Sequence, residues 1–249
     1  SLHNKWKKNL LIKFIYGHNK YSFYFKKKKK IIKDSKTFYF SDKASEFTNY
    51  KSLFENIFQF KINLKIKKYI NKSRNIFIGI HTGSSTNLNY KRWEVSKFII
   101  LINKLLYKKF NIILFGKGYQ EKHINKLICK KINNKNLIDY TDQLDLKGLI
   151  SQLQKCKLLI SNDSGVMQLS NFLSIPTLAL FGPTSEVKNG TFKKNFFVIR
   201  AFSSKYCNKY TNETCVQCRY SSKYKDQTKC LKKIQVNRVY NKTLKILKN

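Results

Sequence analysis

The stretch "LLISNDSGVMQLSNFLSIPTLALFGPT", residues 158–184, holds both prolines of the chain and much of its turn-forming chemistry. The apolar run at 157–161 is typical of a buried strand, and "VMQLSNFL" (166–173) is typical of a helix that stops before Pro176. A second apolar run, 177–181, ends at "GPT". The stretch therefore predicts a strand, a tight turn, a helix and a second strand.

The same alternation extends upstream. Apolar runs at 76–80 and 111–115 indicate two more buried strands. Residues 94–110 place apolar side chains at every third or fourth position, as an amphipathic helix does, and 146–154 is a second such segment. Strands alternating with helices predict an α/β fold with a parallel sheet covered on both faces. Ligands bind such sheets at the carboxyl ends of the strands, so function is expected in the loops that follow them.

The formal net charge of +38 would ordinarily indicate a nucleic-acid or anionic-lipid partner, because clustered cations release counterions from polyanions. Only five of the 51 basic residues are arginine, however, and Lys, Asn, Ile, Tyr and Phe are abundant together. This mixture is typical of an AT-rich genome, and arginine is the better residue for reading phosphates and bases. We therefore expect no nucleic-acid partner, while contact with an anionic membrane surface stays open.

The chain contains no uninterrupted apolar run of about 18 residues or more, so a membrane-spanning helix is not expected. Its first residues also lack the apolar core of a signal peptide, and a cytoplasmic location is the expectation. The chain begins with Ser1, and its single methionine is Met167. We therefore expect a fragment or a processed product of a longer protein.

The loop "HTGSSTNLNYKRW" (residues 81–93) follows the first of these strands and has the residues of an anion cradle. Gly83 permits a tight turn, Ser84 offers a hydroxyl and a backbone amide, and Lys91 stands near the start of the next helix. The alternative is a polar loop that Trp93 anchors in the core. The loop alone does not decide between the two.

Two further loops carry candidate groups. In "KGYQEKH", after the strand at 111–115, Glu121 can accept hydrogen bonds from sugar hydroxyls or stabilise the start of a helix through the helix dipole. In "NDSG", Asp163 or Ser164 can cap the next helix, and Gly165 lets a ligand approach the first-turn amides. The partial positive charge of those amides suits a diphosphate, although Asp-Ser-Gly is also a common cap without a ligand.

The cysteines fall into two groups. Cys129 and Cys156 lie in apolar helical contexts and are expected in the core. The other four have the spacing C-x7-C-x2-C-x11-C: Cys207, Cys215, Cys218 and Cys230. Four thiolates could hold a structural zinc, but only one pair has the tight spacing of a zinc knuckle. Reduced thiols in a C-terminal loop are the alternative, and disulfides are not expected in a cytosolic chain.

Taken together, these motifs resemble glycosyltransferase family 9, the ADP-heptose:lipopolysaccharide heptosyltransferases. The matching segments are, in order, "HTGSS", "KRW", "FGKGYQE", "YTDQLDLKGLISQL", "SNDSGVMQLSNFL" and "LALFGPT". They cover roughly residues 74–240. The ordered set is far more specific than any one of its members.

The resemblance implies a domain organisation. Residues 71–249 would form the Rossmann-like, donor-binding C-terminal half of a GT-B glycosyltransferase. Residues 1–70 would be the end of the N-terminal acceptor domain and the interdomain segment. In the family the general base is an aspartate of the N-terminal half, and Asp34 and Asp42 stand in the wrong context for it. We therefore assign no catalytic base.

The resemblance also implies a reaction: the inverting transfer of a heptose or similar sugar from an ADP-sugar to a lipopolysaccharide core, without a metal or other cofactor. Lys91 would neutralise the charge on departing ADP, Glu121 would hold sugar hydroxyls, and Leu144 would pack near the adenine. The implied donor-binding residues are Thr82, Gly83, Ser84, Ser85, Lys91, Glu121, Leu144, Asp163, Ser164, Gly165 and Gln168. The acceptor would be a lipid-linked saccharide at the inner face of the cytoplasmic membrane.

One position departs from the family pattern. Where the family usually has histidine, three residues after Gly165, this chain has Gln168, which can donate a hydrogen bond but cannot carry a positive charge. The donor could therefore bind more weakly or differ. Two other hypotheses remain at this point: a basic nucleic-acid-binding protein with a zinc-stabilised tail, and a catalytically dead nucleotide-binding remnant.

Overall fold

The structure is a computed structural model. The residues it describes are 13–16, 19–25, 36–40, 76–84, 91–190, 194–200 and 229–248. The chain divides into two compact units, one of Ser1–Leu64 with Val187–Asn189 and the other of Lys65–Glu186 with Gly190–Asn249. The functions expected for residues 1–70 and 71–249 stay predictions.

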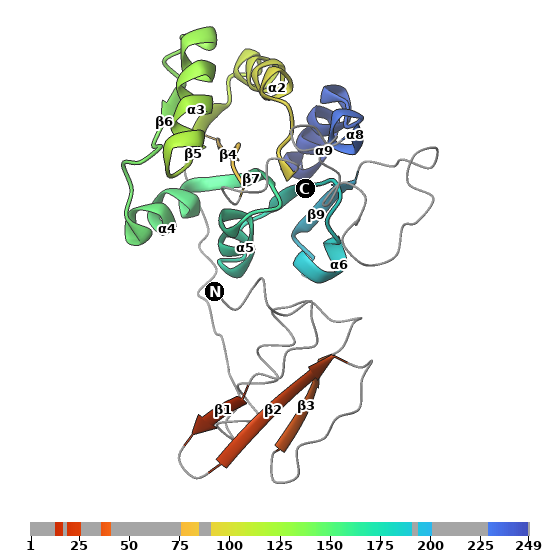
Figure 1. The fold of residues 1–249 in the computed structure, drawn as a ribbon. Helices are drawn as coiled ribbons and strands as arrows, with labels where there is room; N and C mark the ends of the chain where they lie inside the picture. Colours follow the sequence, from red (N-terminus) through yellow and green to blue (C-terminus); the bar gives the residue numbers. More distant parts are fainter. Residues whose placement is uncertain are drawn as a thin grey trace. The chain divides into compact units, whose positions relative to one another are not determined.

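The described part of the first unit contains a three-stranded sheet, drawn in red and orange in Figure 1. Its strands are β1 (Lys13–Tyr16), β2 (Asn19–Phe25) and β3 (Lys36–Phe40). β1 pairs with β2 antiparallel, and β3 pairs with β2 parallel.

The second unit is built on a six-stranded sheet whose neighbouring strands are all parallel, in the order β6-β5-β4-β7-β8-β9. The strands are β4 (Phe77–His81), β5 (Asn111–Phe115), β6 (Leu137–Asp139), β7 (Cys156–Asn162), β8 (Thr177–Phe181) and β9 (Phe196–Arg200). The expected α/β fold with a parallel sheet is confirmed, as are the four strands expected from apolar runs. β6 and β9 were not predicted, because they lie at the sheet edges and are mostly half-buried.

Helices cover both faces of this sheet (Figure 1). One face packs against α2 (Val95–Tyr107), α3 (Tyr119–Ile132), α8 (Lys229–Lys232) and α9 (Val236–Lys248). The other face packs against α4 (Leu146–Lys155) and α5 (Gly165–Phe172), and the short α6 (Glu186–Asn189) follows β8.

Each strand contributes side chains to both faces of the sheet, because successive side chains of a strand point to opposite faces. Ile78 and Ile80 of β4 pack into the cluster under α2, whereas Leu159 of β7 packs under α4 and α5. The helical period of α2 completes the first cluster through Phe98 and Leu101, both completely buried. Burial of each such side chain contributes about 2 kcal/mol to stability.

The strand order reverses its direction at one place. After β4 the chain adds β5 and β6 on one side, then returns to add β7, β8 and β9 on the other. The reversal lies between β4 and β7, and in open parallel sheets ligands bind at the carboxyl ends of the strands where such a reversal occurs. The loops after His81 and Asn162 meet at this edge.

Within the described ranges, none of the helices combines the length and apolar character needed to cross a membrane.

Candidate functional site

Trp93 fixes the loop that carries two of the cationic side chains. Its indole is 2% exposed and donates from Nε1 to the carbonyl of Ile234 at 3.1 Å, while its backbone N–H donates to Asn162 Oδ1 at 3.0 Å. The anchor role considered for this residue is confirmed. The anchor brings Lys91 and Arg92 to the carboxyl end of β7.

Asn162 joins the loops after β4 and β7 into one unit. Its side-chain Nδ2 donates to the backbone carbonyl of Thr82 at 2.7 Å and to that of Gly83 at 3.3 Å. The residue is completely buried, so each of these backbone groups would lose its partner if the amide were removed. The sequence analysis did not single out this residue.

The start of α5 has a side-chain cap and leaves space beside Gly165. Ser164 Oγ accepts the backbone N–H of Met167 at 3.2 Å, so Ser164, and not Asp163, provides the side-chain cap. The helix begins at Gly165, which is exposed, and a Cβ added there would meet no atom of the described residues within 4 Å. The space beside the first turn of α5 is therefore available to a ligand.

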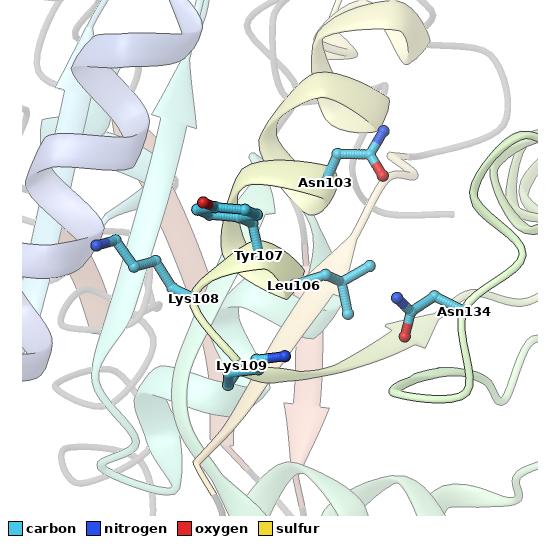
Figure 2. Close-up of a pocket in the computed structure, with 6 residues that line it drawn as sticks. All are labelled: Asn103, Leu106, Tyr107, Lys108, Lys109 and Asn134. Carbon is cyan, nitrogen blue, oxygen red and sulfur yellow. The ribbon is translucent and has the colours of Figure 1, made fainter.

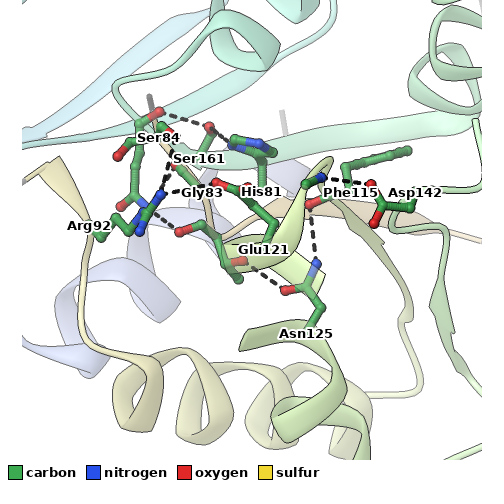
Figure 3. A network of polar contacts seen from close by, with 12 residues as sticks. His81, Gly83, Ser84, Arg92, Phe115, Glu121, Asn125, Asp142 and Ser161 are labelled. Atoms are coloured by element: carbon green, nitrogen blue, oxygen red, sulfur yellow. Dashed lines mark hydrogen bonds and ion pairs between the residues drawn. The ribbon is translucent and has the colours of Figure 1, made fainter. Parts of the chain in front are cut away.

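Two partly buried ion pairs join residues of these loops. Lys91 Nζ lies 2.7 Å from Asp163 Oδ2, with the side chains 12% and 7% exposed. Arg92 Nη2 lies 3.3 Å from Glu121 Oε1 and also donates to the carbonyl of Ser84 at 3.3 Å. Figure 3 shows Arg92 and Glu121 pointing toward each other. Each charge depends on its partner, because an uncompensated buried charge is strongly destabilising.

Glu121 and Gly83 lie in close contact. Glu121 is 4% exposed, and a Cβ added to Gly83 would clash with its carboxylate oxygen Oε1. A side chain at Gly83 would therefore displace the carboxylate from Arg92. Glycine at this position has a packing reason, in addition to the turn that the sequence predicted.

The charges of the two ion pairs cancel. Lys91 is paired with Asp163 and Arg92 with Glu121, while burial, and secondarily the charge of Arg92, lower the pKa of His81 to about 4. His81 is therefore neutral at pH 7. The excess positive charge of the chain does not gather in the described part of this site. An anion here would rely on the amides of α5 and on rearranged ion pairs.

The Thr82 side chain faces α3. Its hydroxyl donates to Asn125 Oδ1 at 2.7 Å, and Asn125 Nδ2 in turn donates to Thr141 Oγ1 at 2.7 Å. Asn125 is completely buried (Figure 3 shows its place beside Glu121). Thr82 therefore links the loop to α3, and its backbone carbonyl is held by Asn162.

The remaining predicted donor residues lie along the same edge or outside the described part. Leu144 is half-buried against the cluster under α4 and α5. Gln168 is exposed on the first turn of α5. Ser85 lies outside the described residues.

The zinc hypothesis falls largely outside the described part as well. Cys207, Cys215 and Cys218 are not described, and the backbone alone of Cys230 is placed, in α8. Among described residues there is no cluster of three or more metal-binding side chains. Cys156 is buried, and burial raises its pKa to about 12, whereas Cys129 is half-buried. A buried thiol with a raised pKa is a packing group, as expected for Cys156.

Sequence reasoning missed four residues of this site: His81, Arg92, Ser161 and Asn162. His81 and Ser161 are direct register partners on β4 and β7. Both interrupt or end apolar strands with a polar side chain, and that pattern at the carboxyl end of neighbouring strands is the signal that could have found them. The neighbour relation itself is not visible in the sequence.

A hollow lies at the amino ends of the strands, where α2 ends and β5 begins (Figure 2). Its lining residues are Asn103, Leu106, Tyr107, Lys108, Lys109 and Asn134. Tyr107 is 84% exposed, and both lysines are exposed. The hollow is open and basic, and it lies apart from the loops that carry the predicted donor residues.

The family model "Glycosyltransferase family 9 (heptosyltransferase)" matches residues 24–220. The chain belongs to glycosyltransferase family 9. This result confirms the resemblance drawn from the loop motifs, and it gives no support to a nucleic-acid-binding protein.

Curated relatives of this family 9 chain include lipooligosaccharide heptosyltransferase 2 of Campylobacter jejuni. The protein of serotype O:2 is 25% identical over 175 residues, covering 69% of this chain and 51% of the relative. The protein of serotype O:6 is 30% identical over 143 residues, covering 56% and 42%. The chain thus spans about half the length of the curated relatives it matches.

Solved structures show the same fold at low identity. Escherichia coli heptosyltransferase WaaC with ADP superposes with a TM-score of 0.61 at 16% identity, covering 84% of this chain and 59% of that chain. E. coli ADP-heptose lps heptosyltransferase II gives a TM-score of 0.57 at 21% identity, covering 82% and 52%. These similarities extend to the fold alone.

Proposed function

We propose that this chain is the donor-binding part of a glycosyltransferase that moves a heptose, or a similar sugar, from an ADP-sugar to a lipopolysaccharide core acceptor. The observation that carries the proposal is the family match over residues 24–220. Curated relatives named heptosyltransferase 2 and a neighbouring structure that contains ADP-2-deoxy-2-fluoro heptose support it.

The geometry supports a diphosphate at the start of α5. The first-turn amides carry partial positive charge, Gly165 leaves room beside them, and Lys91 lies against the neighbouring Asp163. Lys91 would exchange its carboxylate partner for a phosphate oxygen as charge builds on departing ADP. We propose an inverting transfer that needs no metal, with the general base supplied from outside the residues described here.

The remaining predicted contacts follow from this placement. Glu121 lies at the other side of the loop, where its carboxylate could accept hydrogen bonds from ribose or sugar hydroxyls. Leu144 is the proposed neighbour of the adenine. Gln168 stands on the first turn of α5, where its amide could donate to a phosphate oxygen without adding charge.

The test is binding of ADP, measured by titration calorimetry, with UDP as the control ligand. We expect the chain to bind ADP more tightly than UDP. Gly165→Ala adds a methyl group where the ligand would sit and should weaken ADP binding at least tenfold, while the melting temperature stays at or above that of the wild type. Equal binding of ADP by the variant and the wild type would contradict this placement.

We further propose a cytoplasmic location with peripheral contact to anionic lipid, because the proposed acceptor is lipid-linked and the chain is rich in lysine. The chain should sediment with anionic vesicles and not with neutral ones, and high salt should release it because salt screens exposed charges. Equal sedimentation with both kinds of vesicle would contradict an electrostatic contact.

A further inference from the structure

His81 is a buried polar group with no part in the reaction as proposed so far. It is 6% exposed at the carboxyl end of β4, and its Nδ1 lies 3.5 Å from Ser161 Oγ on the neighbouring strand β7. Ser161 is completely buried, and its Oγ lies 3.0 Å from Ser164 Oγ, the cap of α5. A continuous line of polar atoms therefore runs from the imidazole to the open start of the helix (Figure 3 shows the His81 end).

The hydrogen-bond inventory of this line limits how it can be arranged. Each serine hydroxyl has one proton to donate and two lone pairs that accept. Ser161 Oγ donates to the carbonyl of Asn162 at 2.8 Å, so it accepts from Ser164 and from His81 Nδ1–H. Ser164 then donates its proton to Ser161 and accepts a hydrogen bond from the N–H of Met167. In this arrangement the Ser164 hydroxyl has no proton left for a ligand.

In a second arrangement Ser161 gives up its hydrogen bond to the Asn162 carbonyl, and this frees the proton of Ser164. If Ser161 turns its proton to Ser164 Oγ, then Ser164 can donate to an incoming phosphate oxygen while still accepting from Met167. In this second arrangement Ser164 no longer donates to Ser161. Ser161 Oγ then accepts a hydrogen bond only if His81 carries its proton on Nδ1. A neutral imidazole has one ring N–H, and its position is set by the partner it meets.

We infer that His81 is a positioning residue for diphosphate binding, holding an Nδ1–H toward Ser161 so that the Ser161–Ser164 hydroxyl pair can reverse and donate to a phosphate oxygen at the start of α5. The inference rests on the proposed function, because it takes the diphosphate site as given. It concerns two side chains, His81 and Ser161, that do not touch the ligand themselves.

Variants at His81 test the role of Nδ1. His81→Phe keeps a ring without the donor, His81→Asn places an amide where Nδ1 lies, and His81→Gln places it where Nε2 lies. We expect ADP affinity to fall about tenfold in the Phe and Gln variants and to recover in the Asn variant. Affinity for adenosine, which lacks the diphosphate, should stay at the wild-type value in all three.

Ser161→Ala breaks the line at its middle, and Ser170→Ala is its matched control. Ser170 is completely buried and bonds to Thr177 Oγ1 at 2.9 Å, further along α5 and away from the helix start. We expect Ser161→Ala to lose ADP affinity about tenfold with adenosine unchanged, and Ser170→Ala to keep both affinities. Circular dichroism and a melting curve verify that each variant is folded.

The outcomes separate the two proposals. If the wild-type chain fails to bind ADP, the proposed function is wrong and this inference falls with it. If the wild type binds ADP and His81→Phe or Ser161→Ala lowers the affinities for ADP and adenosine equally, the role is structural only and the inference is overturned. Nitrogen NMR of the imidazole gives a second check, since a proton found on Nε2 in the ADP complex would also overturn it.

Discussion

At the carboxyl end of the parallel sheet two ion pairs, Lys91–Asp163 and Arg92–Glu121, are largely buried, whereas at its amino end lysines stand exposed around an open hollow. Lys91 and Arg92 each contact a carboxylate, and both are about one-tenth exposed. Lys108 and Lys109 are exposed at the turn between α2 and β5. Net charge therefore does not locate the candidate site of this chain, because the two ion pairs of the site are each neutral.

The largest expected difference in stability is between asparagine side chains at the carboxyl ends of the strands and those at the hollow. Asn162→Ala should lower the free energy of unfolding by about 4 kcal/mol, because three backbone groups lose a buried partner. Asn103→Ala, at an exposed position of the hollow, should change it by less than about 0.5 kcal/mol. Urea unfolding measures both, and equal effects would break the comparison.

The next effect is acid sensitivity, which should arise at the buried end. The folded pKa of His81 is about 4 against an ordinary value of 6.5, so the unfolded chain takes up the proton first as the pH falls. Stability from this group is fully present above about pH 7.5 and is lost between pH 6.5 and pH 4, by about 3 kcal/mol in all.

A matched pair of unfolding curves isolates this term. His81→Asn cannot be protonated in this range, so its stability should fall less steeply than that of the wild type between pH 6.5 and pH 4. The two curves should run parallel above pH 7.5. Parallel curves over the whole range would show that His81 does not titrate as its burial implies.

A smaller effect distinguishes two glycines of the site. Gly83→Ala should cost about 2 kcal/mol, because the new methyl group displaces the Glu121 carboxylate from Arg92. Gly165→Ala should cost nothing, since its methyl group meets no atom of the described residues. Thermal unfolding of the two variants measures the difference. A stable Gly83→Ala chain would mean that Glu121 has a second position of equal free energy.

The smallest effect lies at the exposed end. Lys109 has a φ of 63°, a left-handed conformation that favours glycine, so Lys109→Gly should raise stability by about 0.5 kcal/mol. Lys108 has a φ of −80°, and Lys108→Gly should instead lower stability by a similar amount. Urea unfolding at matched protein concentration checks the opposite signs.

Much of the local structure could be predicted because it follows from local patterns. Apolar runs predicted β4, β5, β7 and β8 within two residues, and helical spacing predicted α2 and α4. The edge strands β6 and β9 were missed, because half-buried strands have no continuous apolar run. The order of the loop motifs was sufficient to identify the family.

The sequence by itself determined which segments become strands and helices, which loops carry small and polar residues, and the family to which the chain belongs. Only the tertiary structure decided which of those loops meet. Lys91 pairs with Asp163 across 72 positions and His81 contacts Ser161 across 80, and both contacts exist because β7 lies beside β4. Periodicity specifies the faces of an element, but the order of strands in a sheet depends on packing of the whole core, and that order created this site.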